Sequence, residues 1–415
     1  MPNDQLENVD NFITYLFYWN MPLTSLTFLC VSSYFKGARF ISACKEAGCT
    51  IYLLTSKAMA DKPWPHDAIE EVFYMEEAEW DMSSIVSNFA HLIRHQRIDR
   101  IVALDDIDLE KAAILREHFR IPGIGQTTAR YFRDRLAMRM KAAEAGINVP
   151  PFCALFTDKV VHHYTQTVSP PWILKPRTES SAGTKKIHTI DELWTILNGL
   201  GDMRHNYLLE QFKPGDTYYV DTLAAGGKIV FDWCNRNLNN PVEDTYKGTL
   251  FRSVTVPFQS KAEKSLKRLN NQIIKAFGIR NSAIHSEIVQ AKEDEQFYFL
   301  ETSARVGGAH IVEMIEAASG INLWQEWANI EIVSARNLDY TLPEVKNMYS
   351  GLLLSLSHYE HSDTTFFTDA EIIWKINDPH HIGFVLQSSV RDRVLELLEL
   401  YTDRIFKDYH DNAIV

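Results

Sequence analysis

Three short apolar runs near the start of the chain constrain the fold more than any other feature. They span residues 25–31, 50–55 and 100–104, and stretches of helical character separate them. Short apolar runs that alternate with helices are typical of buried parallel strands with helices on the faces of the sheet. The sequence therefore predicts an α/β lobe over about residues 20–125.

Length and charge narrow the classes of protein that the chain can belong to. Its 415 residues indicate two or three lobes, and the net charge of −12 comes without a basic stripe. Nucleic-acid binders depend on such a stripe to neutralise phosphates, so we expect no nucleic-acid partner. No apolar run approaches the roughly 20 residues of a membrane span, so we expect no membrane association.

The cysteines and the first residues indicate the compartment. Five scattered cysteines form no CxxC pair, and the acidic start MPNDQLENVD lacks the basic region of a signal peptide. Scattered cysteines are typical of proteins in a reducing environment. We therefore expect a cytoplasmic protein.

Beyond residue 125 the predicted elements no longer alternate between strand and helix and indicate an α+β arrangement. A Gly/Pro joint at IPGIG precedes a predicted helix over 127–145 and an extended segment, NVPPFCALF. The remaining predicted elements are a small α+β lobe from about 170, a turn at 225–227, a helix over 261–277, a hairpin of 285–288 with 297–301, and a last helix over 390–406.

Lys175 is the first residue in this part whose position indicates chemistry. The apolar residues of WILKP place it at the end of a buried strand, where its ammonium can hold phosphate oxygens. The loop TESSAGTK follows directly, and small residues let backbone N–H groups approach phosphates closely. The loop lacks the Walker A spacing, and taken alone it is equally compatible with a flexible turn.

The segment NYLLEQFKPGDTYYVD, residues 206–221, is the next signal. An apolar strand leads into Glu210, followed by Gln211, Phe212 and a Pro-Gly turn. A glutamate at such a strand end can accept a hydrogen bond from a ribose hydroxyl, while nearby backbone groups can pair with an adenine edge. An ordinary hairpin with a charged tip explains the same residues.

Two acidic positions complete the set. In AIHSEI the alternation places His285 and Glu287 on one strand face, and Glu301 lies fourteen residues further on, room for two paired strands and a turn. Carboxylates among apolar strand residues are costly unless they are paired or metal-bound, and two on adjacent strands suit magnesium.

The segment LETSARVGGAH, residues 300–310, is the most specific motif. Glu301, Ser303 and Arg305 are spaced by two, so in a strand all three would face the same cleft. An arginine there can hold an acyl phosphate or a tetrahedral oxyanion. Gly307 and Gly308 let the backbone pack tightly.

The order Lys-Pro, small-residue loop, Glu with Gly-Asp, His-x-Glu and Glu-x-Ser-x-Arg-x-Gly-Gly resembles the ATP-grasp superfamily. The resemblance covers about residues 25–335 and is greatest to the branch with biotin carboxylase, the glycinamide ribonucleotide enzymes and bacterial L-amino-acid ligases. It implies a mixed α/β and α+β fold with a Rossmann-like lobe (1–125), an ATP-grasp core (126–335, lid lobe about 170–235) and a C-terminal extension (336–415) that completes the large, metal-binding lobe.

The resemblance also implies an ADP-forming carboxylate–amine ligase that joins amino acids through an acyl phosphate. ATP and one or two Mg²⁺ ions are the implied cofactors, with Mn²⁺ as an alternative, and family members are often homodimers. Carried over to this sequence, the implied site residues are Arg305 and Lys175 for catalysis; Arg135, Lys175, Ser180, Ser181, Gly183, Thr184, Glu210, Gln211, Phe212 and Asp216 (or Asp221) for ATP; Glu287, Glu301 and Ser303 for metal; and Arg252, His285, Gly307 and Gly308 for substrate.

Two positions depart from the family pattern. The lysine of the family's Asp-Lys helix is replaced by Arg135, with Arg139 one turn on, and either arginine is a candidate for the phosphate-binding cation. Ser303 stands where the family commonly has an asparagine that ligates metal. A hydroxyl is a weaker ligand, so we expect any second metal ion to bind less tightly.

Other motifs and functions carry less weight. Adjacent histidines at 380–381 point to opposite strand faces, so they make a poor metal site, and neither a dinucleotide fingerprint nor a Gly-x-Ser-x-Gly elbow occurs. Arg252 is equally explained by a surface ion pair. The rival functions are a carboxylase or formyltransferase of the same superfamily and a non-catalytic ATP-binding module.

Overall fold

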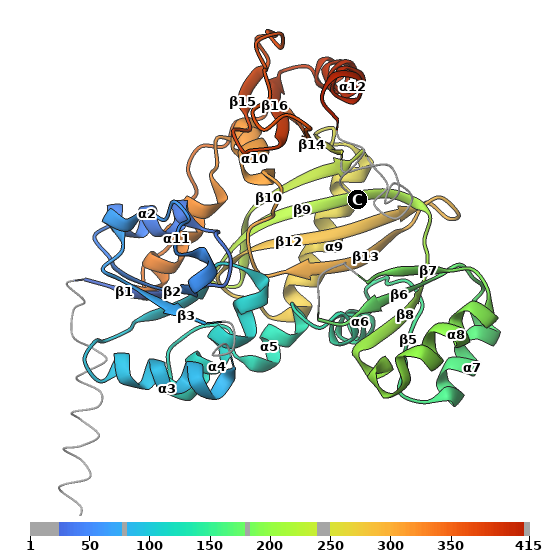
Figure 1. Ribbon diagram of the computed structural model, residues 1–415, viewed down its shortest axis with the longest axis horizontal. Coiled ribbons are helices and arrows are strands. Elements are labelled where there is room, and N and C mark those ends of the chain that lie inside the picture. The colour runs from blue at the N-terminus through green and yellow to red at the C-terminus, as the bar shows by residue number, and fades with distance from the viewer. Residues whose placement is uncertain (1–24, 77–80, 179–182, 239–249, 411–415) are drawn as a thin grey trace, which may run out of the picture.

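The computed structural model describes residues 25–76, 81–178, 183–238 and 250–410, and its strands form three sheets (Figure 1). The first sheet is parallel, with strand order β3-β2-β1-β4. Its elements are β1 (Thr27–Ser32), α2 (Ala38–Glu46), β2 (Thr50–Ser56), β3 (Glu71–Met75), α3 (Met82–Ile93), β4 (Arg100–Ala103) and α4 (Leu109–Phe119). The parallel lobe predicted from the three apolar runs is confirmed.

A fourth strand of this sheet, β3, is an addition to the prediction. β3 pairs with β2 at the sheet edge, and Glu71 and Tyr74 in it are exposed. An edge strand that is half solvated carries no continuous apolar run. The periodicity that identified β1, β2 and β4 was therefore missing here.

A short helical segment leads out of the first lobe. The single helix predicted over 127–145 is wrong, because two helices, α5 (Gln126–Tyr131) and α6 (Arg135–Glu144), replace it. Asp134 breaks the run: its carboxylate accepts hydrogen bonds from the N–H groups of Leu136 and Ala137 and so caps α6. Helix α6 then contacts β13 of the large sheet (Figure 1).

The small sheet has the strand order β5-β8-β6-β7 and carries its own apolar core. Its elements are β5 (Phe152–Ala154), α7 (Asp158–Thr167), β6 (Trp172–Pro176), β7 (Lys185–Ile187), α8 (Ile190–Leu200) and β8 (Tyr207–Gln211). The predicted lid span of about 170–235 differs from this sheet, because β5 joins it from outside that span while residues 215–237 pair elsewhere.

The third sheet has eight strands in the order β13-β12-β9-β10-β11-β14-β16-β15. Its elements are β9 (Gly215–Ala225), β10 (Lys228–Asn237), β11 (Phe251–Thr255), α9 (Lys261–Phe277), β12 (Ser282–Ala291), β13 (Phe297–Ser303), α10 (Ile311–Ser319), α11 (Leu323–Ala335), β14 (Tyr349–Leu356), β15 (Ile372–Lys375), β16 (His381–Ser388) and α12 (Arg391–Asp408). The predicted turn at 225–227, the helix over 261–277 and the last helix are confirmed.

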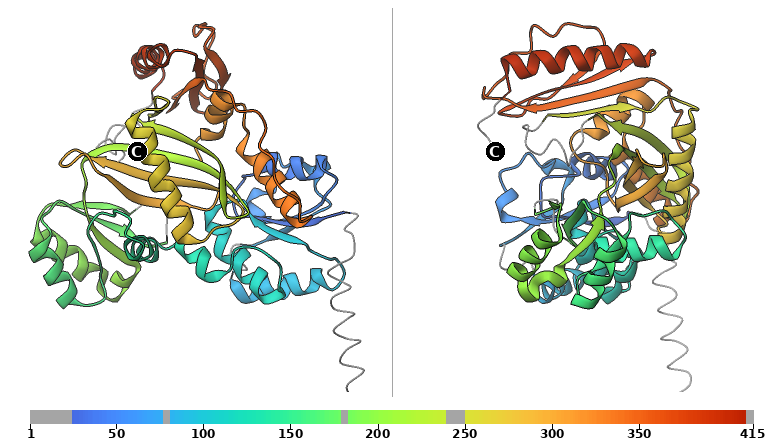
Figure 2. Two further views of the ribbon diagram at one scale, coloured as in Figure 1. Left: turned by 180° about the vertical axis from the view of Figure 1, so that it is seen from behind. Right: turned by 90° about the vertical axis from the view of Figure 1, so that its right-hand side faces the viewer.

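The helices around the large sheet bind the lobes together. Helix α9 covers one face of the sheet, and α12 lies across β14 and β16 (Figure 2). Helix α11 packs against α2 of the first lobe, with the rings of Phe40 and Trp327 5.1 Å apart. Among the described residues, no helix combines the length and the apolar character needed to cross a bilayer.

Candidate active site

Two carboxylates face each other across the first two strands of the large sheet. In the antiparallel pair β12–β13, Glu287 lies directly opposite Glu301, so both side chains project from the same face. The side chains are 47% and 29% exposed, enough for both to reach a ligand. The predicted hairpin is thus confirmed, and its geometry joins the two acids expected to bind metal.

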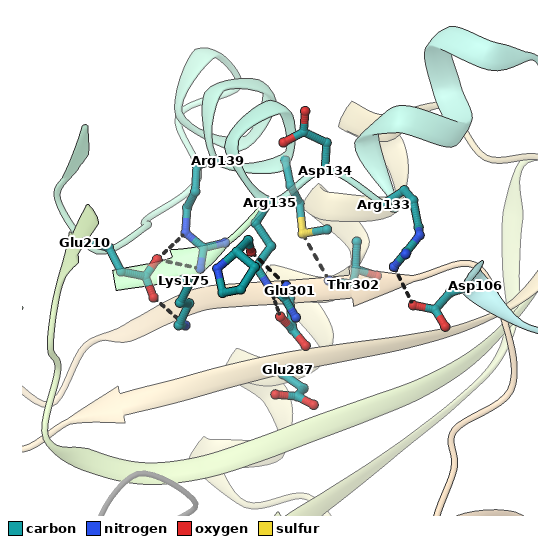
Figure 3. Close-up of polar contacts among 12 residues, drawn as sticks. Asp106, Arg133, Asp134, Arg135, Arg139, Lys175, Glu210, Glu287, Glu301 and Thr302 are labelled. Atoms are coloured by element: carbon teal, nitrogen blue, oxygen red, sulfur yellow. Dashed lines mark hydrogen bonds and ion pairs between the residues drawn. The ribbon is translucent and has the colours of Figure 1, made fainter. Parts of the chain in front are cut away.

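Arg135 at the start of α6 binds one of these acids. Its Nε donates to Oε2 of Glu301 over 2.7 Å, and its Nη1 donates to the carbonyl of Pro176 over 3.0 Å (Figure 3). Burial disfavours the charged carboxylate, but the charges of Arg135 and Lys175 outweigh it and lower the pKa of Glu301. Glu301 is therefore an ionised carboxylate held by a guanidinium.

Glu210 lies beside this pair, between two further cations. Its Oε1 is 2.5 Å from Nζ of Lys175, and its Oε2 accepts from Nε and Nη2 of Arg139 over 3.0 and 2.9 Å (Figure 3). Both Glu210 and Arg139 are buried, and despite that burial the two cations lower the pKa of Glu210. In this state Glu210 orients the cations and has no exposed oxygen for a ribose hydroxyl.

The choice between the two arginines follows from their burial. The side chain of Arg139 is fully buried, whereas that of Arg135 retains 13% exposure and lies next to Glu301. Arg135 is therefore the better placed of the two to meet a phosphate. One atom of Arg139, Nη1, is buried without a hydrogen-bond partner among the described residues.

His285 connects Glu287 to the interior of the large sheet. Its Nδ1 is 2.9 Å from Oδ1 of Asp221, and its Nε2 is 3.7 Å from Oε1 of Glu287. Burial disfavours the imidazolium, but the Asp221 carboxylate outweighs burial and raises the pKa of His285 to about 9. At neutral pH the imidazole ring of His285 is therefore charged, and Asp221 holds it next to Glu287.

Gly307 packs closely against the pair formed by Asp221 and His285. A Cβ at this position would lie 2.8 Å from Oδ1 of Asp221 and 3.0 Å from Nδ1 of His285. Any larger residue would therefore push the loop away from the sheet. Gly308, by contrast, has no atom near the position of a Cβ, so its proposed substrate role gains no support from packing.

Arg305 lies beyond β13, which ends at Ser303, so the expectation that these residues share one strand face with Glu301 is wrong for Arg305. The chain turns toward the first lobe, where Nε of Arg305 is 3.7 Å from Oδ1 of Asp106. That Nε is buried and has no hydrogen-bond partner among the described residues. Its Nη1 donates to the carbonyl of Val306 over 2.9 Å.

Asp106 is a member of the site that the sequence interpretation missed. It follows β4 and also meets Arg133 at 3.4 Å (Figure 3). Burial, together with the neighbouring Asp105, raises the pKa of Asp106. An acidic pair directly after a buried parallel strand was the available signal, because ligands of α/β sheets bind at the carboxyl ends of strands.

The residues expected to hold the nucleotide lie on the small sheet and at its junction with β9. The ring of Phe212 is covered by the ammonium of Lys186, 3.9 Å from its centroid, and Gln211 ends β8. Gly183 and Thr184 precede β7, and Gly183 has φ +95°, a conformation that favours glycine. Ser180 and Ser181 lie outside the described residues.

Of three further expected residues, two form ion pairs elsewhere and the third lies beside the two acids. Asp216 pairs with Arg236 at 2.8 Å. Arg252 pairs with Glu399 of α12 at 3.1 Å, so the ion-pair alternative holds and the substrate interpretation gains no support. Ser303 lies opposite His285 in the β12–β13 register, two residue pairs along from the two acids, so it shares their strand face.

A separate cavity of about 930 Å³ lies at the other end of β12. It is lined by residues of the first lobe and of α11, among them Arg100, Arg116 and Glu331. Arg116 is occupied by the carbonyls of Ile101 and Ile124. These contacts give the arginine a structural role at the junction of the lobes.

The donor set at Glu287 and Glu301 fits magnesium. No group of three or more His, Cys, Asp or Glu side chains in the described part of the chain is arranged to hold a metal ion alone. Mg²⁺ is commonly bound by one or two carboxylates and completes its shell with phosphate oxygens and water. Two ionisable oxygen donors beside phosphate-binding cations meet that requirement.

The chain is similar in sequence or fold to proteins of known function. No model of a known protein family matches the chain. A curated relative, the L-arginine-specific L-amino acid ligase of Bacillus subtilis, is 27% identical over 267 residues, which are 62% of this chain and 63% of the relative. The match thus spans less than two thirds of that protein's length.

Solved structures extend the likeness to nearly the whole chain. An L-amino acid ligase from Bacillus licheniformis superposes with a TM-score of 0.73 at 15% identity, over 93% of this chain and 98% of that one. The biotin carboxylase domain dimer of Hydrogenobacter thermophilus 2-oxoglutarate carboxylase, solved with MgADP, ADP and bicarbonate, gives 0.67 at 13% identity over 92% and 90%. The chain has the ATP-grasp fold. The resemblance to the carboxylate–amine ligase branch of that superfamily is confirmed.

Proposed function

We propose that the chain is an ADP-forming, ATP- and Mg²⁺-dependent carboxylate–amine ligase that joins two amino acids by an amide bond. The carrying observation is the direct pairing of Glu287 with Glu301, next to the cations Arg135 and Lys175. The relative named as an L-amino acid ligase supports the reaction class and the substrate class. The solved neighbour with MgADP supports the cofactors.

The small sheet and α6 provide the phosphate-binding groups. Lys175 and Arg135 carry fixed positive charges at the boundary of the two sheets, where they neutralise phosphate oxygens and align them for in-line attack by a substrate carboxylate. Glu287 and Glu301 would hold Mg²⁺, which when bound supplies a further positive charge to the phosphates. Phe212 packs at the adenine side.

Arg305 acts at the second step. Attack of the amine on the acyl phosphate gives a tetrahedral oxyanion. Arg305, whose Nε has no hydrogen-bond partner among the described residues and is 3.7 Å from Asp106, donates to that oxygen. The intermediate breaks its C–O bond to phosphate, and the former amine nitrogen gives its extra proton to the departing phosphate, which leaves the amide. Because no side chain attacks the substrate, the protein contributes position and charge.

An assay of ADP release with product masses tests the proposal. Purified protein with Mg-ATP is offered pairs of amino acids, and separately bicarbonate with single amines. A product equal in mass to two amino acids minus water, formed with one ADP, is the expected result. The matched control is the Glu287→Gln, Glu301→Gln double variant, which should form no product. ADP release that depends on bicarbonate and gives no such mass would overturn the ligase assignment in favour of a carboxylase.

The remaining features of the proposal are the assembly, the compartment and the lobes. We include a homodimer, because one structural neighbour was solved as a dimer, and sedimentation analysis tests it. We include a cytoplasmic location, because all five cysteines are buried and free. The division into residues 1–125, 126–335 and 336–415 is also retained as a proposal.

A further inference from the structure

Arg135 spans the boundary between the small sheet and the large sheet. One edge of its guanidinium binds Glu301 of β13, and another nitrogen binds the carbonyl of Pro176, the neighbour of Lys175 (Figure 3). Its pKa is raised because the charge of Glu301 outweighs burial. A single side chain thus ties the phosphate-binding strand β6 to a carboxylate that the proposed function assigns to metal.

The charges around Arg135 balance. Three carboxylates, Glu210, Glu287 and Glu301, are matched by three cations, Arg135, Arg139 and Lys175. Buried ions are costly unless their charges are compensated, so a balanced cluster is stable without any ligand. A divalent ion added by itself would leave an excess of two positive charges.

The three cations differ in which acid they hold. Arg139 is fully buried on Glu210, and Lys175 shares that same carboxylate. Arg135 alone among these three is hydrogen-bonded to one of the two acids proposed to bind metal. A guanidinium donating over 2.7 Å occupies an oxygen lone pair that a metal ion would otherwise use.

We propose that Arg135 is an internal counter-ion that protects Glu301 and makes metal binding depend on the nucleotide. When nucleotide phosphates arrive, the guanidinium moves from Glu301 to a phosphate oxygen and so frees the carboxylate. This inference rests on the proposed function, because it assumes that Glu287 and Glu301 bind metal. It goes beyond that function by assigning the order in which the ligands enter.

Binding of Mn²⁺, followed by electron paramagnetic resonance without nucleotide, measures the effect directly. The variants are Arg135→Gln and, as a matched control, Arg130→Gln, which removes an exposed arginine that lies near Glu110. Removing a charge-assisted hydrogen bond that competes with the metal should tighten Mn²⁺ binding by about tenfold in Arg135→Gln. The control should bind Mn²⁺ as the wild-type protein does.

The same titration with saturating ADP provides the second arm. Wild-type protein should then bind Mn²⁺ tightly, and the advantage of Arg135→Gln should shrink to about twofold or less, because the nucleotide has already drawn the arginine away. Equal Mn²⁺ affinity of wild-type and Arg135→Gln protein without nucleotide would overturn the proposal. An advantage that persists unchanged with ADP would also overturn it.

A lysine variant protects the test against misfolding. Arg135→Lys keeps the charge but lacks the planar fork, so its Mn²⁺ affinity without nucleotide should fall between those of the wild-type and glutamine proteins. If Arg135→Gln does not unfold cooperatively, the Arg135→Lys protein is tested in its place. Mn²⁺ affinity equal to that of wild-type protein without nucleotide would then overturn the proposal. Failure of the proposed function has a different signature, namely that wild-type protein binds no Mn²⁺ even with ADP.

Discussion

Two charged clusters, one around Glu210 of the small sheet and one around Asp106 after β4, are built differently. The small-sheet cluster comprises Arg139, Lys175 and Glu210, with contacts of 2.5 to 3.0 Å around the buried carboxylate of Glu210. The β4 cluster comprises Asp106, Arg133 and Arg305, whose contacts are 3.4 and 3.7 Å. Figure 3 shows the small-sheet cluster and, from the β4 cluster, Asp106 and Arg133.

The difference in contact length indicates different roles for the two clusters. In the small-sheet cluster the carboxylate of Glu210 is shared by two cations, so these groups hold one another in place. In the β4 cluster Nε of Arg305 is buried without a hydrogen-bond partner among the described residues. Contacts that are long without substrate and tighten in the reacting complex are common at catalytic groups. The loose cluster is therefore the one expected to respond to substrate.

Removing the acid from the small-sheet cluster should give the largest effect. Glu210→Ala leaves Arg139 buried without its counter-charge, which costs about 3–5 kcal/mol of unfolding free energy. Urea denaturation measures this loss. The double variant Glu210→Leu, Arg139→Met should recover most of it, because an apolar pair of similar volume removes both charges. A loss below about 1 kcal/mol in the single variant would show that the cluster is not tightly coupled.

The β4 cluster should respond in turnover and not in stability. Arg305→Gln is expected to lower kcat by about 10²–10³, the usual effect of losing one oxyanion donor, with the unfolding free energy changed by less than about 1 kcal/mol. Single-turnover amide formation together with urea denaturation checks both values. Arg133→Gln is the matched control, because it also faces Asp106, and its kcat should fall far less. Equal losses in the two variants would remove the distinction between the clusters.

His285 should make the stability of the protein depend on pH. Its pKa is about 9 in the folded protein against an ordinary value of 6.5, so the folded state binds the proton more tightly. Its contribution to stability is therefore fully present below pH 6.5 and is lost as the pH rises through 9. We expect metal-free protein to lose about 3 kcal/mol across this window, at about 1.4 kcal/mol for each pKa unit between 6.5 and 9. If the His285→Gln protein loses the same unfolding free energy between pH 6.5 and 9, groups other than His285 cause the loss.

The sequence predicted the carboxylate pair because both acids belong to local structure. Alternation of apolar and polar residues identified the first strand, and the separation of fourteen residues left enough room for two paired strands and a turn. The structure has this hairpin, with Glu287 opposite Glu301. The bond between Arg135 and Glu301 joins residues 166 positions apart. No periodicity within α6 or β13 indicates which helix packs over which strand, so this contact could not be predicted.

Two of the errors in the placement of elements also have physical reasons. Residues 152–154 were correctly predicted to be extended. They belong to the small sheet because they pair with β8, and local sequence does not indicate that partner. Arg305 continued the two-residue spacing of Glu301 and Ser303, yet the strand had already ended. Spacing predicts a shared face only while the backbone stays extended.

The smallest effect is expected outside both clusters, at Arg252. Its partner Glu399 is 69% exposed, and exposed ion pairs contribute about 0–1 kcal/mol, far less than the buried contacts of Glu210. Arg252→Gln should therefore change the unfolding free energy by at most about 1 kcal/mol and leave KM for both substrates unchanged. Glu399→Gln, which removes the other half of the pair, should lose a similar amount. A KM raised about tenfold in Arg252→Gln alone would restore the interpretation that this arginine holds a substrate carboxylate, since a lost charge-assisted hydrogen bond has that magnitude. Turnover would then depend on a charged group that lies outside both clusters and apart from Arg135, Glu287 and Glu301.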